Sequence, residues 1–577
     1  MFGAYPFFGA RRVIDLNGSW NFKFLGEDID LAAFKLENID FTEKAAVPGV
    51  FDAMPKYAGK RGTVIYNKQM KVSANTSGKI CFGGGGMWFR VYVDGQSVGE
   101  CSLPYSGVSF DVPASENELR DISIIVDNRF DSERVPLFDE FFDFYAYGGF
   151  YRGIEFHELP EAYINRVQIS TVQVEPAIVN FKVLLGGAVS DKETFELELD
   201  GKQLDVQKDI SISYGAAEFE LNLGNIGVWS AEEPVLHELT VKIGDDSITE
   251  RFGIRIVEAK DGKILVNGIE QKLLGYCRHE AHPQCGPALP LHILISDIQQ
   301  LKDLGCNFVR GSHYPQDQRF LDLCDEYGLF VFEESLGWGQ TDSHFNNDNY
   351  VSQCEEQTRI MVQNSFNHPS VILWGFLNEG ASEIECSKPV YELLAKAIRE
   401  EDSSRLVTFA SNRSDRDINL DLVDVVSYNF YPAWYGDRDS HPKLDDIINT
   451  TRKLSEHIKN TQSGKPFIVS EIGAGAIYGW KDPLEGHWSE EYQTKYLETI
   501  CNEVVSNDDI AGISIWQFGD CRTYQNFGML GRPRAFNNKG TVDEYRRPKM
   551  AYKKVKEIFT NADKSTAPTS PTTATAL

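Results

Sequence analysis

Cysteine is scarce in this sequence, and it follows no metal-binding or disulfide pattern. The 577 residues contain 10 cysteines, with no Cys-x-x-Cys and no paired Cys/His cluster. We therefore expect reduced thiols, no zinc site and no disulfide framework. The four-glycine run Gly83–Gly86 lacks the Lys-Ser/Thr of a phosphate-binding loop. We expect neither a metal nor a cofactor.

Long apolar runs and a signal sequence are also missing. The longest apolar runs, such as Leu329–Phe332, are far too short to span a membrane. The N-terminal residues show no basic start followed by an apolar stretch. These features predict a cytoplasmic protein that does not interact with membranes.

Positive charge is in deficit. Lys and Arg number 57 against 85 Asp and Glu, which gives a net charge of -28. A field of this sign argues against nucleic acid and anionic membranes as partners. It does not exclude a small anionic substrate, because screening over roughly 8–10 Å leaves local groups to decide.

Hydrophobic patterning divides the chain into three parts and a tail. Before residue 258, short alternating segments such as MWFRVYVDG and HELTVKIGD predict two β-sandwiches, over 1–160 and 161–257. From 258 to 562, eight apolar strands alternate with amphipathic helices, as in a (β/α)₈ barrel. Segment 414–422, between strands five and six, is too short and polar for a regular helix. The Ser-, Thr-, Ala- and Pro-rich segment 563–577 is predicted to be disordered.

The predicted ends of the barrel strands carry carboxylates and aromatic residues. Glu379 and Glu471 end the fourth and seventh strands, and Trp516 ends the eighth. Catalytic residues of such barrels gather at these ends. A single Glu there is more often structural, but two suit glycoside hydrolysis, which needs an acid and a carboxylate. Neighbouring carboxylates do not both ionise easily, so one is expected to keep its proton.

Many motifs occur in the order of a known family. They include NGSWNFKF, VYVDGQSVG, DFYAYGGFYR, GYCRHEAHP, NFVRGSHYP, HPSVILWGFLNE and SEIGAG. Over about residues 10–558 the sequence resembles glycoside hydrolase family 2, the group of β-glucuronidases, β-galactosidases and β-mannosidases. The resemblance implies a jelly-roll β-sandwich, an immunoglobulin-like β-sandwich and a C-terminal TIM barrel. It also implies a retaining enzyme that forms homo-oligomers.

Carried over residue by residue, the resemblance implies a catalytic pair. Glu379 matches the family's general acid/base and Glu471 its nucleophile, and Asn378 would bind the sugar 2-hydroxyl. Gly380 departs from the pattern, because many relatives have Pro there. Retention implies that the two carboxyl groups lie about 5–5.5 Å apart.

A second set of residues is implied to bind the sugar. Asn537 and Lys539 match the Asn-x-Lys motif with which β-glucuronidases grip the sugar carboxylate, and an amide and an ammonium suit such a group. The other candidate substrate-binding residues are Asp143 and His313 for hydroxyls, Tyr435 near the carboxylate, and Asn429, Tyr431, Trp516, Arg532 and Arg534 around them. His279, His282 and His313 are spread over two strand ends, so we expect no metal there.

The predicted function is an exo-acting, retaining hydrolase of β-D-glucuronides, with a small-molecule glycoside as its partner. A β-D-galacturonidase is the close alternative, because the carboxylate grip is the same for both sugars. A β-galactosidase is more distant, since those relatives typically need metal ions. A non-catalytic carbohydrate-binding protein is the alternative from another class, although both catalytic carboxylates are present.

Overall fold

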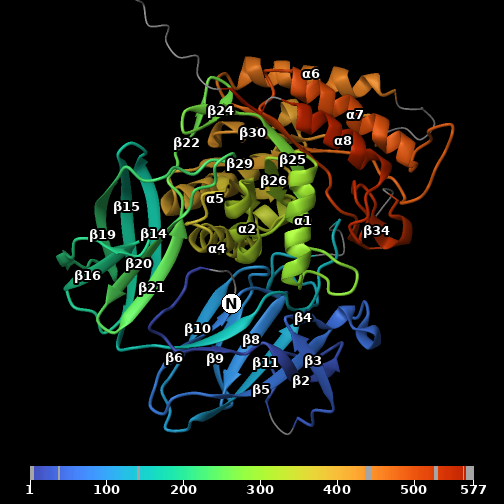
Figure 1. Cartoon of the computed structure of the whole chain (residues 1–577). Helices are drawn as coiled ribbons and strands as arrows, with labels where there is room; N and C mark the ends of the chain where they lie inside the picture. The colour runs from blue at the N-terminus through green and yellow to red at the C-terminus, as the bar shows by residue number, and fades with distance from the viewer. Residues whose placement is uncertain are drawn as a thin grey trace, which may run out of the picture.

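The computed structural model describes residues 5–36, 39–138, 143–435, 443–524, 531–562 and 564–566. Its N-terminal part is an antiparallel sandwich (Figure 1). One sheet contains, in spatial order, β3 (Glu43–Val47), β2 (Gly18–Gly26), β5 (Thr63–Lys71), β11 (Leu119–Asp127), β8 (Trp88–Val93) and β9 (Gln96–Cys101). The other contains β1 (Val13–Asp15), β13 (Ile154–Glu158), β6 (Gly78–Phe82) and β10 (Val108–Val112). A short third sheet contains β4 (Gly49–Val50), β12 (Gly149–Phe150) and β7 (Gly85–Gly86).

A second, smaller sandwich follows. One sheet contains β14 (Ala162–Gln173), β15 (Ala177–Gly187) and β19 (Ala216–Gly224). The other contains β17 (Lys202–Gln203), β16 (Lys192–Leu199), β20 (His237–Ile243) and β21 (Asp246–Phe252), with β18 (Gln207–Ser211) paired to β16. Along β15, Val179, Phe181 and Val183 are buried and the residues between them are not. This alternation is the period of a strand with one face in a core.

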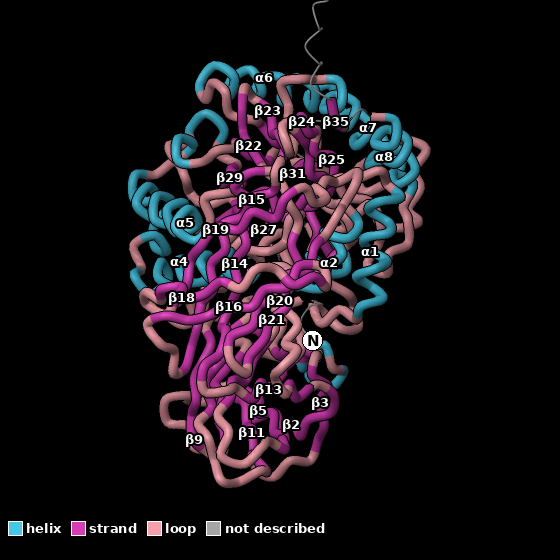
Figure 2. The backbone as a smooth tube through the Cα atoms, turned by 60° about the vertical axis from the view of Figure 1, so that its left-hand side comes forward, coloured by secondary structure: helices cyan, strands magenta, loops and turns pink. Residues whose placement is uncertain are grey.

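The C-terminal part is a closed barrel of parallel strands, as predicted. Its strands are β25 (Leu273–Arg278), β26 (Phe308–Gly311), β27 (Phe330–Glu334), β28 (Val371–Asn378), β29 (Leu406–Ser411), β30 (Val426–Asn429), β31 (Phe467–Ile472) and β32 (Gly512–Ile515). Its helices are α1 (Leu291–Asp303), α2 (Gln318–Tyr327), α3 (Asp342–Phe345), α4 (Asp348–Asn364), α5 (Lys388–Glu401), α6 (Asp445–Thr461), α7 (Glu490–Ser506) and α8 (Met550–Asn561). Figure 2 shows helices on the outside of the barrel.

Local sequence explains how these elements begin and end. The side chain of Asp317 accepts a hydrogen bond from the Arg319 amide and so caps α2, which ends at Gly328 with φ of 65°. Between β29 and β30 the chain forms the 3₁₀ turns Ser414–Arg416 and Leu420–Leu422, which confirms that this polar segment makes no regular helix. No helix in the described ranges is long and apolar enough to cross a membrane.

The segment 563–577, predicted to be disordered, contains one short described strand. Residues Ser565–Thr566 form β35, which pairs with β24 (Ile269–Gln271) beside β23 (Lys263–Val266) and β22 (Val257–Lys260). The edge of β24 offers unpaired backbone groups, and such an edge readily takes another strand. Residues 563 and 567–577 lie outside the described part. The sandwich boundaries at 160 and 257 stay predictions.

The N-terminal sandwich contacts loops at the carboxyl ends of the barrel strands. The ring of Tyr105 stacks on that of Tyr314 with centroids 3.7 Å apart, and the Tyr145 amide donates to the Arg522 carbonyl at 2.8 Å. After β32 the chain continues into the hairpin β33 (Cys521–Arg522) and β34 (Phe536–Asn537). The N-terminal sandwich and the β33–β34 hairpin therefore both lie at the end of the barrel where the strand-end carboxylates are.

Candidate active site

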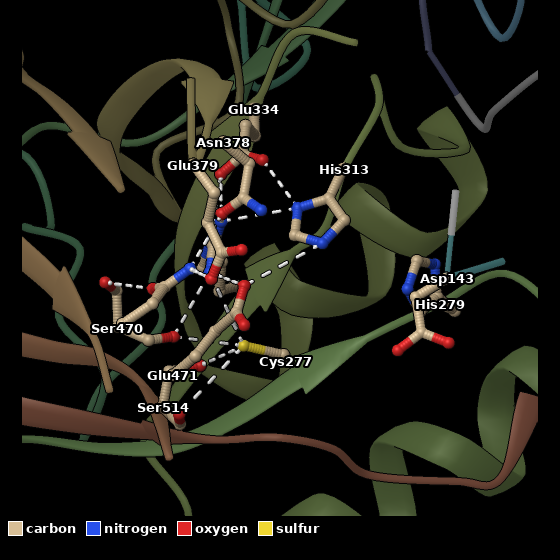
Figure 3. A network of polar contacts seen from close by, with 12 residues as sticks. Asp143, Cys277, His279, His313, Glu334, Asn378, Glu379, Ser470, Glu471 and Ser514 are labelled. Atoms are coloured by element: carbon tan, nitrogen blue, oxygen red, sulfur yellow. Dashed lines mark hydrogen bonds and ion pairs between the residues drawn. The ribbon is translucent and has the colours of Figure 1, made fainter. Parts of the chain in front are cut away.

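Two carboxylates face each other at the carboxyl ends of β28 and β31 (Figure 3). Glu379 directly follows β28, and Glu471 lies within β31. Glu379 has φ of 53°, and its amide donates to the Ala410 carbonyl at 2.9 Å, which turns the chain where the strand ends. The predicted pair is thus brought together by two strands of the same barrel.

Two donors bind the carboxyl group of Glu471. Arg310 Nη1 donates to Glu471 Oε1 at 2.8 Å, and the Tyr431 hydroxyl donates to Oε2 at 2.7 Å. Arg310 is fully buried and also donates to Glu334 Oε2 at 2.9 and 2.6 Å. These hydrogen bonds, one of them from a guanidinium, fix the Glu471 carboxyl group in position, as a nucleophile requires.

Glu379 has the surroundings of an acid. Burial, and next the charge of Glu471, raise the pKa of Glu379 to about 7. Its Oε1 accepts one hydrogen bond, from Asn429 Nδ2 at 3.0 Å, and the same amide donates to Asn378 Oδ1 at 2.9 Å. A buried carboxyl group with a raised pKa beside a second carboxyl group suits the role of general acid.

The pKa of Glu379 predicts a basic limb in the pH profile. A general acid works only while protonated, so kcat/KM is expected to fall as pH rises through about 7. The Glu379→Ala variant should lose that limb, and it should regain turnover with added azide on a substrate whose leaving group needs no proton. A wild-type profile that stays flat to pH 9 would contradict the assignment.

His313 lies beside the pair in its neutral form. Burial lowers the pKa of His313 to about 3, with the charge of Arg310 as the next cause. Its Nδ1 contacts Glu334 Oε1 at 2.8 Å, and its Nε2 lies 3.8 Å from Glu471 Oε1. The Trp516 ring stacks on the imidazole with centroids 5.1 Å apart. With Nδ1 as the donor to Glu334, Nε2 can accept a hydrogen bond from a sugar hydroxyl.

Two more polar atoms are open at this end of the barrel. Asn378 Nδ2 and His279 Nε2 are buried and have no hydrogen-bond partner among the described residues. His279 Nδ1 contacts the Tyr314 hydroxyl at 3.1 Å, and its ring lies 5.2 Å from that of Trp516. Buried polar atoms without partners are rare, so these positions suit hydroxyl groups of a substrate.

The amino group of Lys539 is buried among aromatic rings. It is 2% exposed, and its Nζ donates to the Tyr435 hydroxyl at 2.5 Å. The rings of Tyr435, Tyr431 and Trp434 surround the ammonium at 4.8, 5.4 and 5.7 Å. No carboxylate of the residues that the structure describes forms an ion pair with it. Burial holds the pKa of Lys539 well below its usual value, so an arriving carboxylate would stabilise the charged form.

Three other predicted residues form a cluster next to Lys539. Arg532 donates to both oxygens of Asp143, with Nε to Oδ1 at 2.7 Å and Nη2 to Oδ2 at 2.5 Å. Asn537 Nδ2 donates to Asp143 Oδ2 at 2.6 Å. Arg532 Nη2 also lies 3.3 Å from the Tyr435 hydroxyl, which connects the cluster to Lys539.

The structure separates Arg534 from this cluster. Arg534 has φ of 63°, a left-handed turn that directs its side chain to Glu544 Oε1 at 2.9 Å and Asn538 Oδ1 at 3.1 Å. The side chain is half exposed. The contacts of Arg534 with Glu544 and Asn538 therefore do not join it to Asp143, Arg532 and Lys539, and its role in carboxylate binding stays a prediction.

The sequence prediction did not include Arg310, Glu334 and His279 among the site residues. The signal for the first two was a charged residue inside an apolar strand, in FVRG and FVFEE. Such charges are buried only when paired. His279 directly follows β25, as His313 closely follows β26, and this position at a strand end was the available signal.

One group of described side chains has the spacing of metal ligands, and it lies in another network. Asp322, Asp325 and His368 place their ligand atoms within 4.8 Å of one another. Arg251 Nη2 pairs with Asp322 at 2.9 Å, and His368 Nδ1 contacts Asp325 at 2.6 Å. Because Arg251 already supplies a positive charge to these carboxylates, we interpret the group as an ion-pair network.

The fold and the site together define a glycoside hydrolase. Family models for glycosyl hydrolases family 2 match residues 162–255, and that family's TIM barrel domain matches residues 257–563. The barrel match alone covers more than half of the chain. The chain belongs to glycosyl hydrolases family 2.

Three relatives illustrate the likeness. A GH2 β-galacturonidase from Eisenbergiella tayi, solved bound to galacturonate, is 32% identical with a TM-score of 0.89, covering 98% of this chain and 100% of that one. The β-glucuronidase of Rattus norvegicus is 31% identical over 71% of this chain and 63% of its own length. The β-galactosidase of Thermoanaerobacterium thermosulfurigenes is 28% identical over 94% of this chain and 75% of its own length.

Proposed function

We propose that the chain is an exo-acting, retaining hydrolase of β-D-uronides. The observation that carries the proposal is the buried ammonium of Lys539, which no carboxylate of the described residues neutralises. Burial disfavours the charged form of this unpaired amino group, and a substrate carboxylate would stabilise it. A neutral glycoside would not.

The catalytic pair supports a double displacement. Glu471, held by Arg310 and Tyr431, would attack the anomeric carbon while protonated Glu379 gives its proton to the departing glycosidic oxygen. The bond from the anomeric carbon to that oxygen breaks as the bond to Glu471 forms. Glu379, now ionised, would then take a proton from water, which attacks the same carbon and releases Glu471.

Polar atoms around the pair support the sugar contacts. The open Nδ2 of Asn378 suits the 2-hydroxyl, whose hydrogen bonds tighten toward the transition state. Nε2 of His313 and of His279 can take further hydroxyls, and Trp516 offers an apolar ring face. These contacts would serve any β-hexopyranoside, so the choice of a uronide depends on Lys539.

The two uronides differ only in the orientation of the 4-hydroxyl, and both remain candidates. Similarity to β-glucuronidases supports the glucuronide. Similarity over the full length of the Eisenbergiella tayi β-galacturonidase is the specific observation that favours the galacturonide. Cytoplasmic location and homo-oligomer formation stay predictions.

A comparison of four nitrophenyl glycosides tests the proposal. We expect kcat/KM for β-D-glucuronide or β-D-galacturonide to exceed that for the β-D-galactoside and β-D-glucoside, because the neutral sugars leave Lys539 unpaired. Each uronide is compared with the neutral sugar of the same 4-hydroxyl configuration. A neutral glycoside cleaved as fast as its uronide would overturn the proposal, and the faster uronide identifies the substrate.

A further inference from the structure

Asp143 makes its contacts within the protein. Both of its oxygens accept hydrogen bonds from Arg532, and Oδ2 also accepts one from Asn537. A carboxylate bound by an arginine fork in this way is fixed in position. Figure 3 shows Asp143 apart from the Glu379 and Glu471 carboxylates.

The ion pair between Asp143 and Arg532 joins two parts of the chain that are far apart in sequence. Asp143 lies between β11 and β12 of the N-terminal sandwich, whereas Arg532 and Asn537 follow the last barrel strand. The side chains of Arg532 and Asp143 are 1% and 14% exposed. Removing one partner of an ion pair this buried leaves the other charge without compensation, which is strongly unfavourable.

Asp143 also determines how Asn537 points. Because Asn537 Nδ2 donates to Asp143, its Oδ1 faces the other way and accepts from the Lys539 amide at 3.2 Å. The side-chain amide of Asn537 therefore connects the backbone of Lys539 to Asp143 by two hydrogen bonds.

The charged groups of Asp143, Arg532 and Lys539 leave one amino group that a single carboxylate of a ligand could pair with. Arg532 and Lys539 both contact the Tyr435 hydroxyl, at 3.3 and 2.5 Å, so two cations share one oxygen. Asp143 neutralises Arg532, which leaves the charge of Lys539 for a ligand. Without Asp143, the two cations would face each other with no anion between them.

We propose that Asp143 is a positioning residue for uronate binding: its ion pair with Arg532 and its bond to Asn537 hold the Lys539 ammonium ready for one carboxylate. The inference rests on the proposed uronide hydrolysis. It assigns Asp143 a role that differs from the direct hydroxyl contact implied by the family resemblance. It predicts that Asp143 acts on substrate binding through Arg532.

A double-mutant cycle tests this coupling. Asp143→Asn and Arg532→Gln are each expected to lower kcat/KM on the better nitrophenyl uronide by about 30-fold or more, mainly through KM. Since both remove the same ion pair, the double variant should lie within about threefold of the worse single variant. Arg532→Lys, which keeps the charge and loses the fork, should fall between wild type and Arg532→Gln.

The controls separate positioning from folding and from the proposed function. Arg90→Gln removes an arginine–carboxylate pair elsewhere, the more exposed pair of Arg90 on β8 with Glu100 on β9, and should change neither KM nor kcat. Losses that multiply in the double variant would show that Asp143 contacts the sugar independently, and would overturn the inference alone. Absence of uronide turnover by the wild-type protein would overturn the inference and the proposed function together.

Discussion

Glu471→Gln is expected to reduce uronide turnover by roughly 10⁴-fold or more, the scale seen when a covalent nucleophile is removed. The amide cannot form the glycosyl ester, and it also loses the charge that Arg310 holds at 2.8 Å. The measurement is kcat on the better nitrophenyl uronide, at substrate concentrations above KM.

Covalent trapping supplies the independent check of Glu471. A 2-fluoro-uronosyl fluoride should label the wild-type protein once per chain and leave Glu471→Gln unlabelled, as judged by intact mass. Glu503→Gln changes a carboxylate on α7 that pairs with Arg452 of α6, and this variant should label as wild type does. Normal labelling of Glu471→Gln would contradict the assignment.

Lys539→Met is expected to cost uronide hydrolysis about 30-fold to several thousand-fold in kcat/KM, because removing one partner of a desolvated charge pair costs about 2–5 kcal/mol. Methionine keeps an unbranched apolar stem among the rings of Tyr431, Trp434 and Tyr435, so packing changes little. The measurement is kcat/KM of both proteins on a uronide and on the neutral galactoside.

The neutral substrate decides how Lys539 acts. If the ammonium binds the sugar carboxylate, Lys539→Met should leave hydrolysis of the galactoside within about threefold of wild type, or raise it, because no charge is left unpaired. Equal losses on both substrates would show that Lys539 supports the site as a whole and would remove the case for a uronide.

The sequence was enough to bring Glu379 and Glu471 to one end of the barrel. The strands before Glu379 and Glu471 are runs of apolar residues, and a barrel brings the ends of such strands to one face. The polar segment between β29 and β30 was also interpreted correctly, because too few apolar residues recur there for a helix.

Contacts between distant segments could not be predicted from local patterns. The ion pair of Asp143 with Arg532 joins residues 389 positions apart, and no periodicity reports such a pairing. Arg534 was grouped with Arg532 because the two are neighbours in sequence, but a left-handed turn directs it to Glu544. The pairing of Ser565–Thr566 with β24 depends on an edge that exists only in the folded protein.

The central claim is that a buried ammonium awaits the carboxylate of the substrate. Calorimetric titration of the wild-type protein with galacturonate and glucuronate, each against its neutral uronamide, tests it most directly, because acid and amide differ in charge and little in shape. We predict that the better uronate binds at least about 30-fold more tightly than its amide. Equal affinity for a uronate and its amide would contradict the account.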